Sequence, residues 1–182
     1  PRANLLFEDG VKWIQEASPE SADIIIVDST DPVGPAEGLF TKDFFAQCET
    51  VLKPGGIFVQ QSESPLFHAD SIISKMRSDL VKCGFSYLKT FMFPQSCYPS
   101  GWWSCTMAGK DNPLQRVGHF DAEKHATRYY NQAIHEASLA IPQFCREIWE
   151  EKWTAPPKLN YAGMSPAAVR WSDEYKPMFK KG

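Results

Sequence analysis

The sequence has no excess of basic residues. Its 182 residues carry 19 Lys and Arg against 22 Asp and Glu, which gives a formal net charge of −3. A protein that neutralises many phosphates needs a basic surface, so nucleic acids and anionic membranes are poor candidates for the main partner. A cationic or neutral small molecule fits this charge balance better.

Cysteine pairs with the spacing of a metal or redox site are also missing. The five cysteines are widely spaced and none forms a C-x-x-C pair: Cys48, Cys83, Cys97, Cys105 and Cys145. This pattern argues against a zinc site and against a thioredoxin-like motif, and it favours reduced thiols. No apolar run approaches the roughly 20 residues that cross a bilayer, and the first residues do not have the layout of a signal peptide. We therefore expect a cytoplasmic protein that holds no metal.

The residues that are present predict one globular α/β unit. Hydrophobic residues make up 43% and charged residues 23% of the sequence, which suits a domain with a substantial core. Apolar spacing predicts strands over 5–7, 22–27, 56–61, 86–93 and 102–109, and helices over 10–17, 41–52 and 66–83. We expect Thr41 to cap the second helix and Gly84 to end the third. The last two strands flank a Pro, Ser and Gly turn typical of a hairpin.

Alternating strands and helices predict a mostly parallel sheet with helices on both faces, followed by antiparallel strands. The run at 22–27 is continuously apolar and is therefore expected to be a central strand. Ligands of such sheets bind outside the carboxyl ends of the strands. Asp9, Asp28 and Gln61 each stand at the end of a predicted strand, so one crevice could collect all three.

Two carboxylates, Asp28 and Asp31, directly follow the apolar run in "DIIIVDSTDPVGPAE". Ionised carboxylates in a cleft repel each other unless a cation lies between them, which suits an amine ligand. Ordinary turn chemistry is an equally good explanation of the same residues, because Asp and Ser bind their own backbone and Asp-Pro starts turns.

Three segments give the sequence a family likeness: "VDSTDPVGPAEGLF", "YPSG" at 98–101 and "RYYNQAIHEASLAIPQF" at 128–144. Over about residues 5–149 the chain resembles polyamine aminopropyltransferases, above all the spermidine synthases. This resemblance implies a Rossmann-like, methyltransferase-type fold. It also implies transfer of a 3-aminopropyl group from decarboxylated S-adenosylmethionine, a co-substrate, to putrescine, with no prosthetic group.

The resemblance also implies roles for residues that would face the amine. Asp28 would be the general base, and Asp31 would anchor an amine of the substrate. Gln61 and Tyr98 would orient the amine or the aminopropyl chain. The residues alone favour Gln61 as a polar strand end and Tyr98 as a residue packed against a loop.

A second group of residues would face the nucleoside. Asp9 and the adjacent Gly10 resemble an adenine contact, and Pro35 and Ala36 resemble a wall against the same ring. The residues alone favour Asp9 as the cap of the following helix.

Three further residues have less specific surroundings. Trp102 and Trp103 could line the cleft, although we expect a core role for at least one of them. For Glu63 we expect an ordinary solvated charge.

Relatives in this family also carry a β-stranded N-terminal domain and a glycine-rich nucleoside loop, and "KPGG" at 53–56 is no substitute because it ends a helix. We therefore expect 1–149 to be the C-terminal portion of a catalytic domain, with 150–182 as an irregular extension. A homo-oligomer, dimer or tetramer, is expected from the family. Alternative functions are a putrescine N-methyltransferase of the same fold and a non-catalytic module that binds polyamines or a partner. The acceptor, which could be putrescine, cadaverine or spermidine, is left open.

Overall fold

The computed structural model describes residues 3–111 and 127–149, and all statements about the structure concern these residues. The chain runs in the order α1 (Gly10–Glu16), β1 (Ala22–Val27), η1 (Gly34–Phe40), α2 (Lys42–Val51), β2 (Leu52–Gln61), α3 (Pro65–His68), η2 (Ala69–Ile73), α4 (Ser74–Lys82), β3 (Tyr87–Pro94), β4 (Trp102–Gly109), α5 (Gln132–Ser138) and α6 (Gln143–Trp149). The prediction over 150–182 lies outside the described residues.

The described strands form one mixed sheet in the order β1-β2-β4-β3. β1 and β2 are parallel, whereas β4 runs antiparallel to both β2 and β3. The predicted antiparallel hairpin is confirmed, as is the α/β class. Parallel pairing of β1 and β2 brings the carboxyl ends of both strands to the same edge, which is where Asp28 and Gln61 lie.

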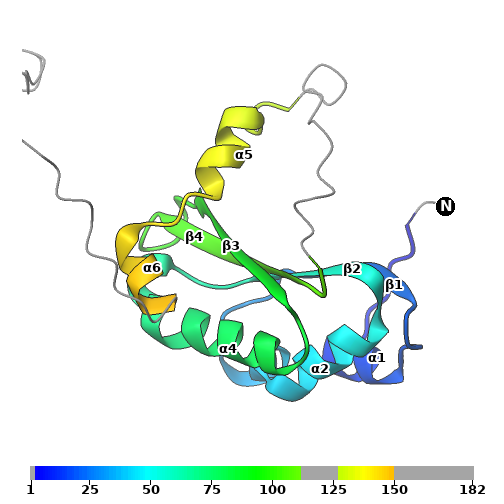
Figure 1. Ribbon diagram of the computed structural model, residues 1–182. Coiled ribbons are helices and arrows are strands. Elements are labelled where there is room, and N and C mark those ends of the chain that lie inside the picture. The colour runs from blue at the N-terminus through cyan, green and yellow to red at the C-terminus, as the bar shows by residue number, and fades with distance from the viewer. Residues whose placement is uncertain (1–2, 112–126, 150–182) are drawn as a thin grey trace, which may run out of the picture.

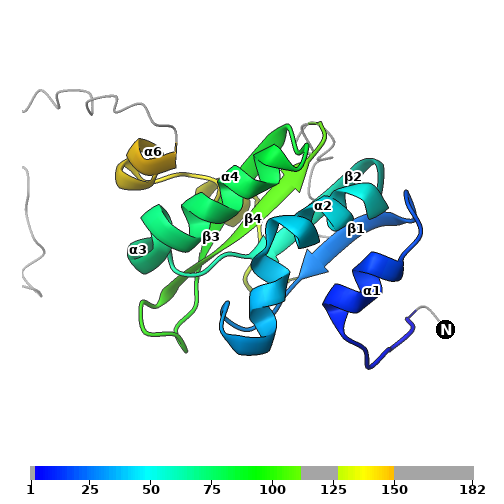
Figure 2. The ribbon, with the colours of Figure 1, turned by 90° about the horizontal axis from the view of Figure 1, so that it is seen from below.

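Helices α1, α2 and α4 lie on one face of the sheet, and α5 lies on the other (Figures 1 and 2). The main core forms between the three helices and the sheet. Phe45 and Phe58 are fully buried there with their ring centroids 5.8 Å apart, and Phe85 continues the aromatic cluster. Burial of this apolar surface is the main term that holds α2 and α4 to the sheet.

Two predicted helix boundaries are confirmed, one by a hydrogen bond and one by a backbone conformation. The Thr41 hydroxyl accepts a hydrogen bond from the Phe44 N–H and so caps α2. Gly84 follows α4 with a φ of +103°, a left-handed conformation that favours glycine. The predicted helix at 66–83 is instead three consecutive pieces, α3, η2 and α4, and η2 has π-helical geometry. In α4, Leu80 is fully buried, whereas the adjacent Val81 is 59% exposed.

One strand prediction is wrong, and a second differs from what the described sheet shows. The segment at 5–7 forms no strand among the described residues, and Phe7 is 91% exposed. β1 is the edge strand of the described sheet instead of a central one, and Ile24 and Ile26 are exposed. An apolar run alone does not show which strands lie beside it, since that depends on pairing with distant segments. Among the described residues, no helix is long and apolar enough to cross a membrane.

Candidate functional site

A pocket of about 280 Å³ opens where the ends of β1 and β2 meet the β3–β4 hairpin. Of the residues predicted to face an amine, it brings together all four: Asp28, Asp31, Gln61 and Tyr98. These residues come from three separate parts of the chain. Their convergence follows from the parallel pairing of β1 and β2 and from the hairpin that returns beside β2.

Asp28 and Asp31 form the acidic side of the pocket, and both residues are exposed. The turn between them is held by other groups: the Ser29 hydroxyl donates to the Thr30 carbonyl oxygen at 3.1 Å, and the Val33 N–H donates to the Asp31 carbonyl oxygen at 2.7 Å. Ser29 thus bonds its own backbone, as turn chemistry predicts, whereas neither of these bonds uses the Asp28 or Asp31 carboxylate. The negative charge of Asp28 also reaches Cys105, whose thiol pKa rises to about 12, chiefly because the thiol is buried.

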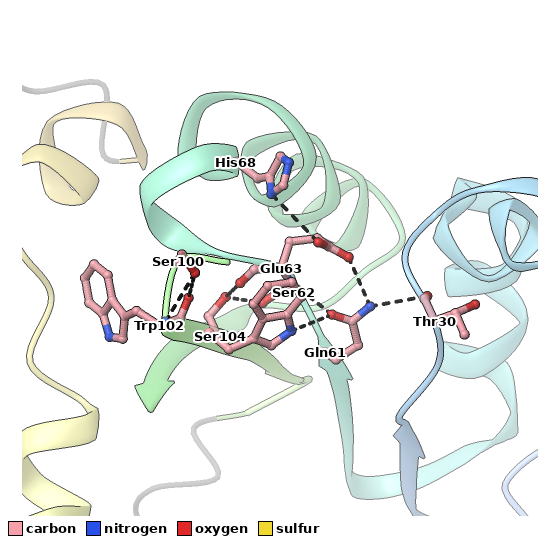
Figure 3. Close-up of polar contacts among 9 residues, drawn as sticks. Thr30, Gln61, Ser62, Glu63, His68, Ser100, Trp102 and Ser104 are labelled. Carbon is pink, nitrogen blue, oxygen red and sulfur yellow. Dashed lines mark hydrogen bonds and ion pairs between the residues drawn. The ribbon is translucent and has the colours of Figure 1, made fainter. Parts of the chain in front are cut away.

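Gln61, the last residue of β2, is 6% exposed and connects three segments. Its amide oxygen accepts hydrogen bonds from Trp103 Nε1 and from the Glu63 backbone N–H, each at 3.1 Å. Its amide nitrogen donates to the Thr30 carbonyl oxygen at 3.4 Å and to Glu63 Oε1 at 3.3 Å. Figure 3 shows the side chain pointing between Thr30 and Glu63.

Glu63 is 2% exposed, so the expectation of a solvated charge is wrong. Its φ is +70°, an uncommon conformation for a residue with a side chain, and such residues gather at functional sites. The Ser104 hydroxyl donates to its carbonyl oxygen at 2.8 Å. Burial, opposed by the hydrogen bond from Gln61 and reinforced by the nearby Asp31 carboxylate, raises the Glu63 pKa from 4.5 to about 7. His68 Nδ1 lies 3.8 Å from Glu63 Oε2.

The two adjacent tryptophans have different environments. Trp103 is 8% exposed, lines the pocket and stacks on Tyr98 with a ring-centroid distance of 4.3 Å. Trp102 borders a separate apolar cavity between the hairpin and α5, and its ring contacts Phe144. Alternation along β4 explains this, since neighbouring side chains of a strand point to opposite faces. Trp103 is thus a pocket residue that the sequence left undecided.

The four residues predicted to face a nucleoside do not line this pocket. Asp9 caps α1, because its Oδ1 accepts hydrogen bonds from the Val11 and Lys12 N–H groups at 2.8 and 3.2 Å. Gly10 is the first residue of α1, and Pro35 and Ala36 belong to η1, which contacts α1. The structure thus shows a capping role for Asp9, whereas the nucleoside role of these residues stays a prediction.

The class of this protein is defined by its similarity to known sequences. The family model described as "Spermine/spermidine synthase domain" matches residues 1–117. The polyamine aminopropyltransferase of Thioalkalivibrio sulfidiphilus is 54% identical over 149 residues, which are 81% of this chain and 53% of the relative. That of Methylococcus capsulatus is 54% identical over 152 residues, 83% of this chain and 53% of the relative.

Solved structures agree with the sequence comparison. A spermidine synthase in complex with the transition state analogue AdoDATO has a TM-score of 0.72 and 31% identity, covering 84% of this chain and 52% of the other. The spermidine synthase of Thermotoga maritima has a TM-score of 0.69 and 30% identity, covering 84% and 51%. The chain therefore belongs to the spermine/spermidine synthase family. It spans about half the length of the curated relatives that it matches.

Proposed function

We propose that the protein acts in aminopropyl transfer from decarboxylated S-adenosylmethionine to putrescine, with spermidine and methylthioadenosine as products. The observation that carries this proposal is the pocket that gathers Asp28, Asp31 and Tyr98 in a member of this family. A volume of about 280 Å³ lies at the small end of ligand pockets. This size suits a small diamine, with the nucleoside held by surface outside the pocket.

In this proposal Asp28 is the general base and Asp31 the anchor of the amine. An alkylammonium group has a pKa of about 10, similar to Lys, so the amine must lose a proton before it can attack. Asp28 accepts that proton, and the neutral nitrogen then attacks the aminopropyl carbon next to the sulfonium. The new C–N bond forms as the C–S bond breaks. The electron pair of the C–S bond leaves with sulfur, which becomes a neutral thioether. The product nitrogen remains as a secondary ammonium.

Position is the main contribution that the protein makes to such a reaction, because the sulfonium is already a good leaving group. Asp31 would hold the cationic acceptor while Tyr98, stacked on Trp103, limits where its methylene chain can lie. We also propose that Asp9, Gly10, Pro35 and Ala36 contact the nucleoside. Residues 1–149 would form the C-terminal portion of the catalytic domain of a cytoplasmic homo-oligomer.

The proposal is tested on the full native gene product with putrescine and either decarboxylated or intact S-adenosylmethionine. Mass spectrometry should find spermidine and methylthioadenosine with the decarboxylated donor. N-methylputrescine formed from the intact donor would identify a methyltransferase instead. Putrescine binding without any transfer would identify a non-catalytic binding module. Parallel reactions with cadaverine and spermidine would define the acceptor.

A further inference from the structure

The Gln61 amide has no hydrogen-bonding capacity left for a ligand. A primary amide offers two acceptor sites on oxygen and two hydrogens on nitrogen. Trp103 Nε1 and the Glu63 backbone N–H occupy the oxygen, each at 3.1 Å. The Thr30 carbonyl oxygen and Glu63 Oε1 occupy the two hydrogens, at 3.4 and 3.3 Å.

The chemistry of the partners fixes which way the amide points. An indole N–H and a backbone N–H can only donate, so both require the amide oxygen. A carbonyl oxygen can only accept, so Thr30 requires the amide nitrogen. The Glu63 carboxyl has an acceptor oxygen in either protonation state, and its protonated form can also donate to the nearby Asp31 carboxylate. A flipped amide would oppose donor to donor and acceptor to acceptor at these positions.

These four bonds connect the two sides of the pocket. Thr30 directly precedes Asp31, the proposed amine anchor. Trp103, on the opposite side, stacks on Tyr98 at 4.3 Å between ring centroids. Gln61 therefore lies between the turn that carries Asp31 and the aromatic pair that includes Tyr98.

We propose that Gln61 is a positioning residue: Trp103 and Glu63 lock its amide, and the locked amide holds the Thr30–Asp31 turn at a fixed distance from Tyr98. This inference rests on the proposed function, and it differs from the direct amine contact that the family resemblance implies for Gln61. A substrate amine that reached the amide would have to replace one of the four protein partners. The pocket would then recognise the acceptor through Asp31 and Tyr98, whose separation Gln61 maintains.

The kinetic test uses Trp103→Phe in the full native gene product, because this change removes the Nε1–H donor and keeps a ring on Tyr98. We expect KM for putrescine to rise about fivefold, which is the effect of one lost hydrogen bond. We expect little change in kcat. Glu63→Ala should raise KM by a similar factor, whereas Glu63→Gln keeps an acceptor oxygen and should restore the wild-type value. Trp102→Phe is the matched control and should leave KM unchanged, because Trp102 borders the other cavity.

A double-mutant cycle tests whether Trp103 acts on the acceptor through Gln61. If Trp103 acts through Gln61, adding Trp103→Phe to Gln61→Ala should change KM by less than about twofold. Full additivity of the two effects would overturn the proposal, as would a normal KM in the Trp103→Phe variant.

A measurement that needs no turnover completes the test. Hydrogen exchange of the Gln61 side-chain amide, followed by NMR, should be at least about tenfold slower than that of exposed Gln15, since a hydrogen-bonded group must open before it exchanges. Exchange as fast as that of Gln15 would refute the lock whatever the activity. The wild-type protein could instead show a protected Gln61 amide and no transfer to putrescine. That result would overturn the proposed function and leave the locked amide established.

Discussion

Glu63 gives the protein a pH-dependent stability that can be measured without any substrate. The side chain is 2% exposed, and its pKa rises from 4.5 to about 7 on folding. The folded state therefore binds this proton more tightly than the unfolded state does. The contribution of Glu63 to stability is complete below about pH 4.5, and it is lost as the pH rises through about 7.

The size of this loss follows from the shift. Each pKa unit is worth about 1.4 kcal/mol, so the full shift corresponds to about 3 kcal/mol. Most of it falls between about pH 5 and about pH 8, where we expect the free energy of unfolding to drop by roughly 2 to 3 kcal/mol from this residue alone. Glu63→Gln resembles the protonated acid, because its amide can accept from Gln61 and donate to Asp31 at every pH.

The assay is urea denaturation of the full native gene product at several pH values, followed by near-UV circular dichroism. The difference in unfolding free energy between Glu63→Gln and wild type should grow in favour of the variant as the pH rises. Glu16→Gln is the control, because the Glu16 side chain is 69% exposed and its contact to Lys12 is 3.8 Å long. A difference that stays constant from about pH 5 to about pH 8 would refute the buried, proton-binding state of Glu63.

Three other changes test the site and the fold. Asp28→Asn should reduce turnover by at least about a hundredfold while nucleoside affinity, measured by calorimetry with methylthioadenosine, changes little; near-normal turnover would remove Asp28 from the role of base. Asp9→Ala should lower the unfolding free energy by about 1 kcal/mol through loss of the α1 cap, and an unchanged value would contradict that role. Phe45→Ala should lower it by about 3 to 5 kcal/mol, because Phe45 is fully buried against Phe58; a loss below about 1 kcal/mol would show that the core is not packed as described.

Much of the local structure could be predicted from the sequence because its causes are local. The Thr41 cap, the left-handed Gly84 and the hairpin turn depend on a few neighbouring residues, and the structure confirms each of them. The three motif segments, of which the one that contains Asp28 is the most specific, together indicated the family. The α/β class followed from the alternation of apolar periods.

The burial of polar groups could not be predicted from the sequence, because it depends on segments that are distant in the chain. Glu63 is buried where the hairpin places Ser104 and Trp103 beside the end of β2. The same pairing brings Trp103 to the Gln61 amide oxygen, whereas sequence position alone suggested a free amide at a strand end. β1 has the composition of a central strand, yet its place at the edge of the described sheet is set by its pairing partners. The sequence by itself thus determined the family and pointed to Asp28 and Asp31 as pocket residues, and only the tertiary structure decided which polar groups are bound by the protein and which are available to a ligand.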